Sequence, residues 1–287
     1  MIDINEISIE FAQEFEFYDI LNKIHEFFEK DEGYFASNVP TLYKKDINTY
    51  KNHIVAKHKG KIVGVLAFVK KELIALDSSF SLMVIGSVSV DKDYRKLGIV
   101  TKMFDLLYKI YDQEIDVYSL FGDIKRYENY GFNKCDESKL FVYEGLDYGY
   151  QFIKMNESNY QESLELFNTL KYRIIRNELF YDSISMWKDV PYVIYKNNKY
   201  IGYLSYNTKN KIVEELFSND ITLTNDIMQS FAKYVDGEVS LKITKQNFFM
   251  ERKLKHINEL KFIKEDILCR ILNPKLEGLY VPRHDLI

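Results

Sequence analysis

Three cations gather at the start of a predicted helix within the segment from Val84 to Asp112. The segment begins with alternating apolar, β-branched residues typical of a strand, and it ends with an amphipathic pattern typical of a helix. The cations nearest the helix start are Arg95, Lys96 and Lys102. A helix start carries free backbone N–H groups and a partial positive charge, so cations there are unfavourable unless an anion binds. The segment therefore predicts a strand–turn–helix that binds a polyphosphate.

Gly98 lies inside the same turn, where a missing side chain lets the backbone approach an anion closely. The pattern Val90-x-x-x-x-Arg95-x-x-Gly98-x-Val100 resembles the acetyl-coenzyme A signature of the GNAT N-acetyltransferases, Arg/Gln-x-x-Gly-x-Gly/Ala. Val100 stands where that family prefers Gly or Ala. A second motif follows in the family's order, because the run from Tyr127 to Phe132 resembles Tyr-x-x-x-Gly-Phe.

The resemblance implies a cofactor site and one catalytic residue. In the family, the strand before the turn holds the pantetheine and the thioester, and the turn binds the phosphates mainly through main-chain N–H groups. The implied cofactor-binding residues are Val88, Ser89, Val90, Arg95, Lys96, Leu97, Gly98, Ile99, Val100, Thr101 and Asn129. Tyr127 is the implied general acid that protonates the departing sulfur, and Arg126 is a further candidate contact. Without the resemblance, the same residues also fit an interior strand and a solvated charged turn.

The general base is not identified by any pattern. The available carboxylates and histidines are Glu72, Asp77, Asp116, Glu128, His25, His53 and His58. Surface solvation explains each carboxylate, and ordinary packing or exposure explains each histidine. A water relay is equally compatible with direct transfer.

Composition limits the class of protein. The 287 residues, 46% hydrophobic and 15% aromatic, suffice for two domains with their own cores. A formal charge of −4 argues against a general nucleic-acid-binding role. The two cysteines lack metal-ligand spacing, so neither a metal site nor a disulfide framework is expected. The acidic N-terminus and the absence of an apolar run of about 18 residues lead us to expect a soluble, cytoplasmic protein without membrane contact.

The second half of the chain repeats part of the first. The residues from Tyr192 to Tyr206 align without gaps on Ile54–Phe68 of the expected hairpin His53–Lys71, and Gly202 falls on Gly64. A further strand and a further helix are expected downstream, over residues 211–217 and 225–235. The connection between them contains neither glycine nor a cation, so nothing there favours a pyrophosphate. A repeated unit of this kind predicts a tandem arrangement with a degenerate second copy.

These observations predict an α/β (α+β) protein of two GNAT-like units, each a mixed, mostly antiparallel twisted sheet flanked by helices. The expected domains are residues 1–146, with the acetyl-coenzyme A site, and residues 147–287. The arrangement resembles the N-terminal two domains of the enhanced-intracellular-survival type of acetyltransferase. The implied activity is transfer of acetyl from acetyl-coenzyme A to a primary amine of a small molecule or peptide, with any oligomeric state allowed. Two alternatives stay open: a non-catalytic acyl-coenzyme A sensor, and an acyltransferase with another acyl donor.

Overall fold

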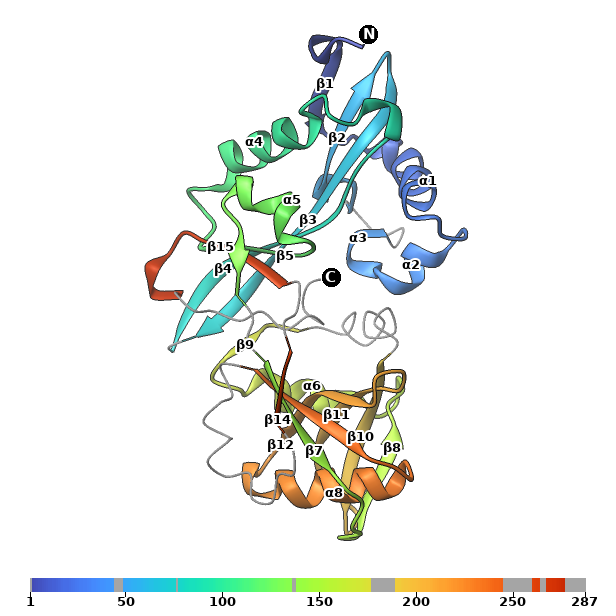
Figure 1. Cartoon of the computed structure of the whole chain (residues 1–287), viewed down its shortest axis with the longest axis vertical. Helices are drawn as coiled ribbons and strands as arrows, with labels where there is room; N and C mark the ends of the chain where they lie inside the picture. Colours follow the sequence, from blue (N-terminus) through green and yellow to red (C-terminus); the bar gives the residue numbers. More distant parts are fainter. Residues whose placement is uncertain are drawn as a thin grey trace. The chain divides into compact units, whose positions relative to one another are not determined.

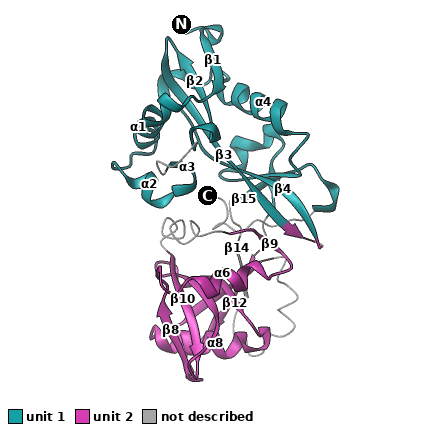
Figure 2. Cartoon of the chain, turned by 180° about the vertical axis from the view of Figure 1, so that it is seen from behind, with its two compact units in different colours: residues 1–73, 78–135, 266–287 teal, residues 74–77, 136–265 magenta. Residues whose placement is uncertain are grey.

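The computed structural model describes residues 2–43, 49–75, 77–135, 138–176, 189–244, 260–263 and 267–276 (Figure 1). The chain folds into two compact units (Figure 2). Unit 1 comprises residues 1–73, 78–135 and 266–287, and unit 2 comprises residues 74–77 and 136–265. The units therefore differ from the two consecutive domains expected from the sequence. The strand Ser138–Tyr143 was expected in the first domain but pairs in the second sheet, and a strand from near the chain's end pairs in the first.

Unit 1 is built on a mixed sheet with the strand order β1-β2-β3-β4-β5-β15-β6. Its strands are β1 (Ile7–Phe11), β2 (His53–His58), β3 (Lys61–Ala75), β4 (Ser78–Val90), β5 (Val117–Phe121), β6 (Asn133–Lys134) and β15 (Ile267–Ile271). The short strand β9 (Arg173–Ile174) belongs to unit 2. β4 and β5 run parallel, whereas β1–β2, β2–β3, β5–β15 and β15–β6 are antiparallel. The predicted hairpin is confirmed, while β1 and β15 were not foreseen.

The predicted helix after the charged turn is confirmed as α4, which spans the expected residues Ile99–Tyr111. The other helices of unit 1 are α1 (Phe17–Phe28), α2 (Tyr34–Asn38), α3 (Pro40–Tyr43) and α5 (Ile124–Tyr127). Short 3-10 turns are η1 (Ile4–Glu6), η2 (Glu14–Glu16), η3 (Thr49–Asn52), η4 (Lys92–Tyr94), η5 (Glu128–Tyr130) and η9 (Pro274–Leu276).

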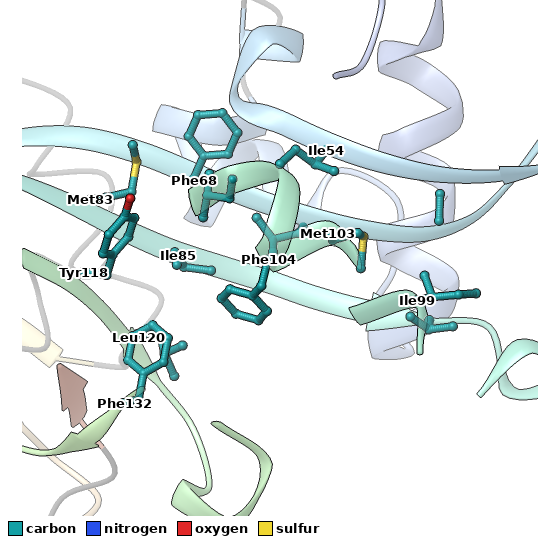
Figure 3. Packing of buried hydrophobic residues seen from close by; sticks show 14 of the residues in the cluster. Ile54, Phe68, Met83, Ile85, Ile99, Met103, Phe104, Tyr118, Leu120 and Phe132 are labelled. Atoms are coloured by element: carbon teal, nitrogen blue, oxygen red, sulfur yellow. The ribbon is translucent and has the colours of Figure 1, made fainter. Parts of the chain in front are cut away.

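The core of unit 1 lies between α4 and one face of the sheet (Figure 3). Ile54, Phe68 and Ile85 extend from β2, β3 and β4 and share one buried cluster with Met103 and Phe104 of α4. Successive side chains of a strand point to opposite faces, so the residue before Ile54 faces away from α4. That residue, His53, contacts Tyr43 of α3. Helix α4, which follows the charged turn, and the short helix α3 therefore lie on opposite faces of the sheet.

An ion pair connects β15 to the end of α4. Both terminal nitrogens of Arg270 donate to the Asp112 carboxylate, at 2.8 and 2.9 Å, and the Tyr118 hydroxyl donates to the same carboxylate at 2.8 Å. The Arg270 guanidinium also lies over the Tyr108 ring, 3.9 Å from its centroid. Burial by itself would raise the pKa of Asp112, but the hydrogen bonds from Arg270 and Tyr118 and the Arg270 charge outweigh it, so that pKa is lowered.

We expect Asp112→Asn to lower the free energy of unfolding by about 2 kcal/mol at pH 7, the usual range for hydrogen bonds to a charged group. Because the folded pKa of Asp112 lies below its unfolded value of about 3.9, its contribution is present above that pH and is lost as the pH falls through the folded pKa. The difference from the wild type, measured by urea denaturation, should therefore shrink below about pH 4. Asp105→Asn on the exposed side of α4 is the matched control, and an equal loss there would contradict the expectation.

Unit 2 contains the second mixed sheet, in the order β14-β7-β13-β12-β11-β10-β8. Its strands are β7 (Ser138–Tyr143), β8 (Tyr150–Lys154), β10 (Asp189–Lys196), β11 (Lys199–Asn207), β12 (Ile212–Ser218), β13 (Val239–Thr244) and β14 (Leu260–Ile263). Its helices are α6 (Gln161–Asn168), α8 (Thr224–Tyr234) and the 3-10 turn η7 (Ile221–Leu223). β12 and β13 are parallel, and α8 covers the core between Phe152, Tyr192 and Leu241. The two-unit fold class predicted from the sequence is confirmed. None of the helices in the described ranges combines the length and the apolar character needed to cross a bilayer.

The sequence repeat corresponds to a structural repeat. The hairpin β2–β3 has a register shift immediately after Ala56, and the hairpin β10–β11 has one immediately after Ile194, the aligned residue. Both hairpins turn through two consecutive residues with positive φ, as two-residue hairpin loops require. These residues are Lys59, Gly60, Asn197 and Asn198. In unit 2, however, the corresponding helix is α8, which follows β12 and begins at Thr224, directly after Leu223. The residues between β12 and α8 include neither the glycine nor the cations found before α4.

The aligned glycines face the strand that follows each hairpin. A Cβ at Gly64 would lie 3.3 Å from the Ser89 carbonyl oxygen of β4, and a Cβ at Gly202 would lie 2.1 Å from the Phe217 carbonyl oxygen of β12. The contact at Gly202 is with main chain, which cannot rotate away as a side chain can. Close approach of two strands therefore explains the repeated glycine.

We expect Gly202→Ala to lower the free energy of unfolding by about 3 kcal/mol, because the strands β11 and β12 must move apart to admit the methyl group. Urea denaturation monitored by circular dichroism would measure the loss. Gly237→Ala is a suitable control, since its nearest contact would be the end of the Lys211 side chain at 3.9 Å. A Gly202→Ala variant as stable as the control variant would contradict the close packing.

Candidate cofactor and acyl-transfer site

The two parallel strands in the middle of the first sheet separate at their carboxyl ends. Pairing between β4 and β5 runs from Leu82–Val117 to Ile85–Leu120 and then stops, although β4 continues to Val90. On its other side β4 stays beside β3, where the Asp91 N–H donates to the Val63 carbonyl at 2.8 Å. Within the described residues, the segment from Gly86 to Val90 thus has a main-chain edge that β5 does not cover. Such an edge can bind an extended ligand as an added strand.

Ser87 bends β4 at this point. Its φ is 52°, a left-handed value that non-glycine residues rarely adopt in a strand. A local kink of this kind disrupts pairing and redirects the neighbouring backbone groups. Ser87, Val88 and Ser89 are each only half-buried, in contrast to the buried residues of β4 before Gly86. The predicted thioester-binding residues Val88, Ser89 and Val90 therefore lie directly after the bend, along the uncovered edge.

The charged turn presents its cations to solvent. Arg95 and Lys96 are exposed, and the Arg95 Nε atom donates to the Val90 carbonyl at 3.3 Å. Lys96 and Gly98 both have positive φ, 66° and 77°, so the chain turns sharply between β4 and α4. Gly98 is the residue before the first turn of α4, and a Cβ there would meet no described atom within 4 Å. The space beside this glycine is open.

The first turn of α4 offers unpaired N–H donors. The first hydrogen bond along the helix runs from the Lys102 N–H to the Gly98 carbonyl at 3.1 Å. The N–H groups of Ile99, Val100 and Thr101 precede it and have no acceptor within the helix. This turn contains no acidic residue, and no side chain from the described ranges caps it. It therefore combines free donors, the positive end of the helix dipole and nearby cations, the features of an anion site.

Three apolar residues among the predicted cofactor-binding positions point into the core. Ile99 is buried in the core, and Leu97 and Val100 are half-buried against it. The Val100 side chain thus packs in the core, where the family signature has a smaller residue. These positions contribute main-chain groups to the site, while Thr101 is exposed at its surface.

Tyr127, the predicted general acid, lies on α5 beside the end of β5. Its ring packs edge-on against Phe104 and Phe132, and a Cβ at Gly122 would lie 2.7 Å from the Tyr127 ring. Burial raises the pKa of Tyr127, although the Arg126 charge lowers it in part. A tyrosine hydroxyl has an ordinary pKa of about 10 and is protonated at neutral pH, and the raised pKa keeps it so. The Tyr127 hydroxyl has no hydrogen-bond partner in the part of the chain that the structure describes.

A residue that sequence reasoning missed links the two motifs. The Tyr130 ring stacks on Phe104 with 4.5 Å between centroids, and its hydroxyl lies 3.2 Å from the Thr101 hydroxyl, within hydrogen-bond distance. Tyr130 therefore joins the second motif to the first turn of α4. Its position between Tyr127 and Gly131 was visible in the sequence, but its contact depends on the folded arrangement of α4 and η5. Asn129, another predicted contact, is exposed on η5.

Most candidates for the general base already have structural partners. Asp116 accepts hydrogen bonds from the Ser81 N–H and from Asn273, both at 2.8 Å, and Glu72 accepts one from Ser79 at 2.6 Å. His58 lies within hydrogen-bond distance of Tyr94 and Glu6. Asp77 and Glu128 are exposed. His25 and His53 differ, because each has a buried nitrogen without a partner among the residues that the structure describes.

Comparison with known proteins finds a family match in the first half of the chain. Residues 8–135 match the family described as Acetyltransferase (GNAT) domain. That match, which spans less than half of the chain, makes this segment similar to GNAT acetyltransferase domains, which are acyltransferase enzymes. No curated protein sequence matches the chain.

Solved structures of similar fold extend the likeness to both units. A probable N-acyltransferase from Enterococcus faecalis V583 shares 10% identity at a TM-score of 0.73, covering 93% of this chain and 73% of its own. Eis1 from Mycobacterium abscessus shares 11% identity at a TM-score of 0.62, covering 92% and 73%. N-myristoyltransferase from Saccharomyces cerevisiae, solved with bound myristoyl-CoA, shares 11% identity at a TM-score of 0.51, covering 93% and 84%. The fold over both units is thus that of tandem GNAT proteins.

Proposed function

We propose that the chain transfers an acetyl group from acetyl-coenzyme A to a primary amine by direct attack. The observation that carries the proposal is the first turn of α4. Three N–H groups there lack helical acceptors, the turn has no acidic residue, and Arg95 and Lys96 lie exposed just before it. A diphosphate matches this combination in both charge and hydrogen-bonding capacity.

The residues present fit the diphosphate and the pantetheine of the donor. The diphosphate would bind at the N–H groups after Gly98, whose open side admits it without steric conflict. The pantetheine would extend along the uncovered edge of β4 from Val90 towards Ser87, with main-chain groups as its partners. When bound, the donor supplies a thioester carbon that an amine can attack. The main-chain N–H groups of this edge are suited to stabilise charge on the carbonyl oxygen.

Tyr127 is suited to supply the proton that the departing thiolate needs. In the transfer, a C–N bond forms at the acyl carbon as the C–S bond breaks, the amine loses one proton, and the sulfur gains one. Tyr127 is protonated at neutral pH, as any tyrosine with a pKa of about 10 or above is, and burial raises its pKa further. Its hydroxyl has no competing partner among the described residues. These two properties support its role as general acid. The proposed acceptor is a small-molecule or peptide amine, and the proposed location is the cytoplasm.

Calorimetry of the full chain with acetyl-coenzyme A tests the proposal. We expect saturable binding, and we expect S-acetylpantetheine, which lacks the diphosphate, to bind at least about 100-fold more weakly. Release of free thiol in the presence of a panel of primary amines then measures transfer. Binding without release from any amine would favour the non-catalytic sensor, and release only with a longer acyl group would favour another donor. Absence of saturable binding at millimolar concentration would contradict the site itself.

A further inference from the structure

Tyr127 depends on its surroundings to hold its hydroxyl in place. That hydroxyl has no hydrogen-bond partner among the described residues, so no bond of its own fixes its direction. Its ring packs edge-on against Phe104 and Phe132, with 6.3 and 6.2 Å between centroids. A catalytic group that is displaced by about 1 Å can lose 10²-fold in rate. The groups that fix the segment around Tyr127 therefore matter for the proposed proton transfer.

Phe104 of α4 is the common packing partner of this segment. Its side chain is fully buried, and the rings of Tyr127, Tyr130 and Phe132 contact it at centroid distances of 6.3, 4.5 and 6.0 Å. The Tyr130 ring is stacked on it at an interplanar angle of 19°, whereas the Tyr127 ring meets it edge-on. The proposed general acid and Tyr130 therefore share one support on α4.

Two hydrogen bonds hold Tyr130 on α4, one on each side of Phe104 along the helix. The Tyr108 hydroxyl donates to the Tyr130 carbonyl oxygen at 3.0 Å, and the Tyr130 hydroxyl lies 3.2 Å from the Thr101 hydroxyl. Thr101, Phe104 and Tyr108 occupy positions i, i+3 and i+7 of α4, so they lie on one face of the helix. Tyr130 therefore cannot shift along this face without breaking one of the two bonds.

Arg270, from the distant strand β15, supports the same turn. Its guanidinium lies 3.9 Å from the centroid of the Tyr108 ring and is bound by the Asp112 carboxylate. The stem of its side chain packs on Gly131, because a Cβ at Gly131 would lie 3.2 Å from both Cδ and Nε of Arg270. Gly131 has a φ of 86°, the left-handed conformation in which the chain turns from η5 towards β6. Arg270 thus packs on both the helix residue and the glycine that adjoin Tyr130.

We propose that Tyr130 is a positioning residue for acyl transfer, which holds Tyr127 at a fixed place relative to the first turn of α4. The inference rests on the proposed function and deepens its account of the general acid. In that function the diphosphate of the donor binds at the first turn of α4, and the sulfur lies near Tyr127. Tyr130 connects these two places, because its hydroxyl meets Thr101 of the first turn and its ring shares the support of Tyr127.

The length of the donor explains why such a connection is useful. Once the pantetheine extends along the edge of β4, the donor itself sets the separation between its diphosphate and its sulfur. The protein groups that serve these two ends must then keep a matching separation. The hydrogen bonds of Tyr130 to Thr101 and Tyr108 provide it, because both partners belong to the rigid helix that begins at the diphosphate site.

A double-substitution cycle on kcat separates positioning from a general loss of structure. Tyr130→Phe removes the bond to Thr101 and keeps the stack on Phe104, and Tyr108→Phe removes the bond to the Tyr130 carbonyl. We expect each to lower kcat for the best amine of the panel about 10-fold, with the KM for acetyl-coenzyme A within about threefold. In the Tyr127→Phe background, neither should lower kcat further by more than about twofold, because the group through which they act is gone.

Tyr118→Phe is the matched control. It removes another tyrosine hydrogen bond beside Arg270, the one at 2.8 Å to the Asp112 carboxylate, and leaves the bonds of Tyr130 intact. We expect its melting temperature to fall at least as much as that of Tyr108→Phe, with kcat within about twofold of the wild type.

Two results would contradict the inference and leave the proposed function standing. One is a wild-type kcat in both Tyr130→Phe and Tyr108→Phe beside a slow Tyr127→Phe. The other is a full further loss of about 10-fold in the Tyr127→Phe background, since the effect would then not pass through Tyr127. A wild type that transfers acetyl to no amine would contradict both the inference and the proposed function.

Discussion

Gly98→Asp is expected to abolish acetyl-coenzyme A binding, with a loss of at least about 100-fold in affinity by calorimetry. The new carboxylate would stand at the N-terminus of α4, where three N–H groups lack helical acceptors and no described side chain caps the helix. An aspartate at such a position can accept those N–H groups itself and repels a diphosphate by its charge. The expected loss therefore combines competition for the donors with like-charge repulsion.

The control for this variant is Gly60→Asp. Gly60 has the same φ of 77°, and a Cβ there also meets no described atom within 4 Å, but it lies in the hairpin turn between β2 and β3. Both variants carry the cost of about 1 kcal/mol for a non-glycine residue in the left-handed region, and Gly98→Asp can regain part of it by capping α4, so it should be no less stable than Gly60→Asp. Only Gly98→Asp should lose affinity. Equal affinity in the two variants would refute the phosphate site at the start of α4.

Tyr127→Phe is expected to lower kcat by about 10²- to 10³-fold while the affinity for acetyl-coenzyme A changes less than about twofold. The hydroxyl has no partner among the described residues, so its removal should leave the packing against Phe104 and Phe132 intact. The loss would then be confined to the step in which the sulfur departs. Thiol release at saturating donor and amine measures kcat, and calorimetry measures the affinity.

The matched control is Tyr111→Phe. Burial also raises the pKa of Tyr111, and its ring packs against Phe11 and Phe68, but it lies at the opposite end of α4. If the two variants have the same kcat as the wild type, Tyr127 is not the general acid. If both are equally slow, the effect belongs to the loss of a buried hydroxyl in general and not to proton transfer.

Local patterns predicted the elements that carry the site. The charged turn, the helix Ile99–Tyr111 and the hairpin at Lys59-Gly60 each depend on residues within a few positions of one another, and each lies where the sequence placed it. The same holds for the hairpin Tyr192–Tyr206, whose register shift repeats that of the first unit. Side-chain periodicity and turn chemistry are local properties, so they can be recognised in the sequence without knowledge of the fold.

Contacts between distant segments could not be predicted in this way. The pairing of Cys269 with Ser119 in β15–β5 spans 150 positions, and nothing near either strand specifies its partner. For the same reason β7 was expected in the wrong sheet. Among the described residues, the buried nitrogens of His25 and His53 that lack a hydrogen-bond partner are likewise a property of the folded unit.

By itself, therefore, the sequence determined the charged turn before α4, the Tyr127 motif and the repeat of the hairpin, because spacing along the chain encodes them. Tertiary structure alone decided where β4 separates from β5, how Tyr130 reaches Thr101, and which histidines keep an unpartnered nitrogen among the described residues. Those outcomes depend on which backbone and side-chain groups remain unpaired after all others have found partners. That balance is a property of the whole packed unit.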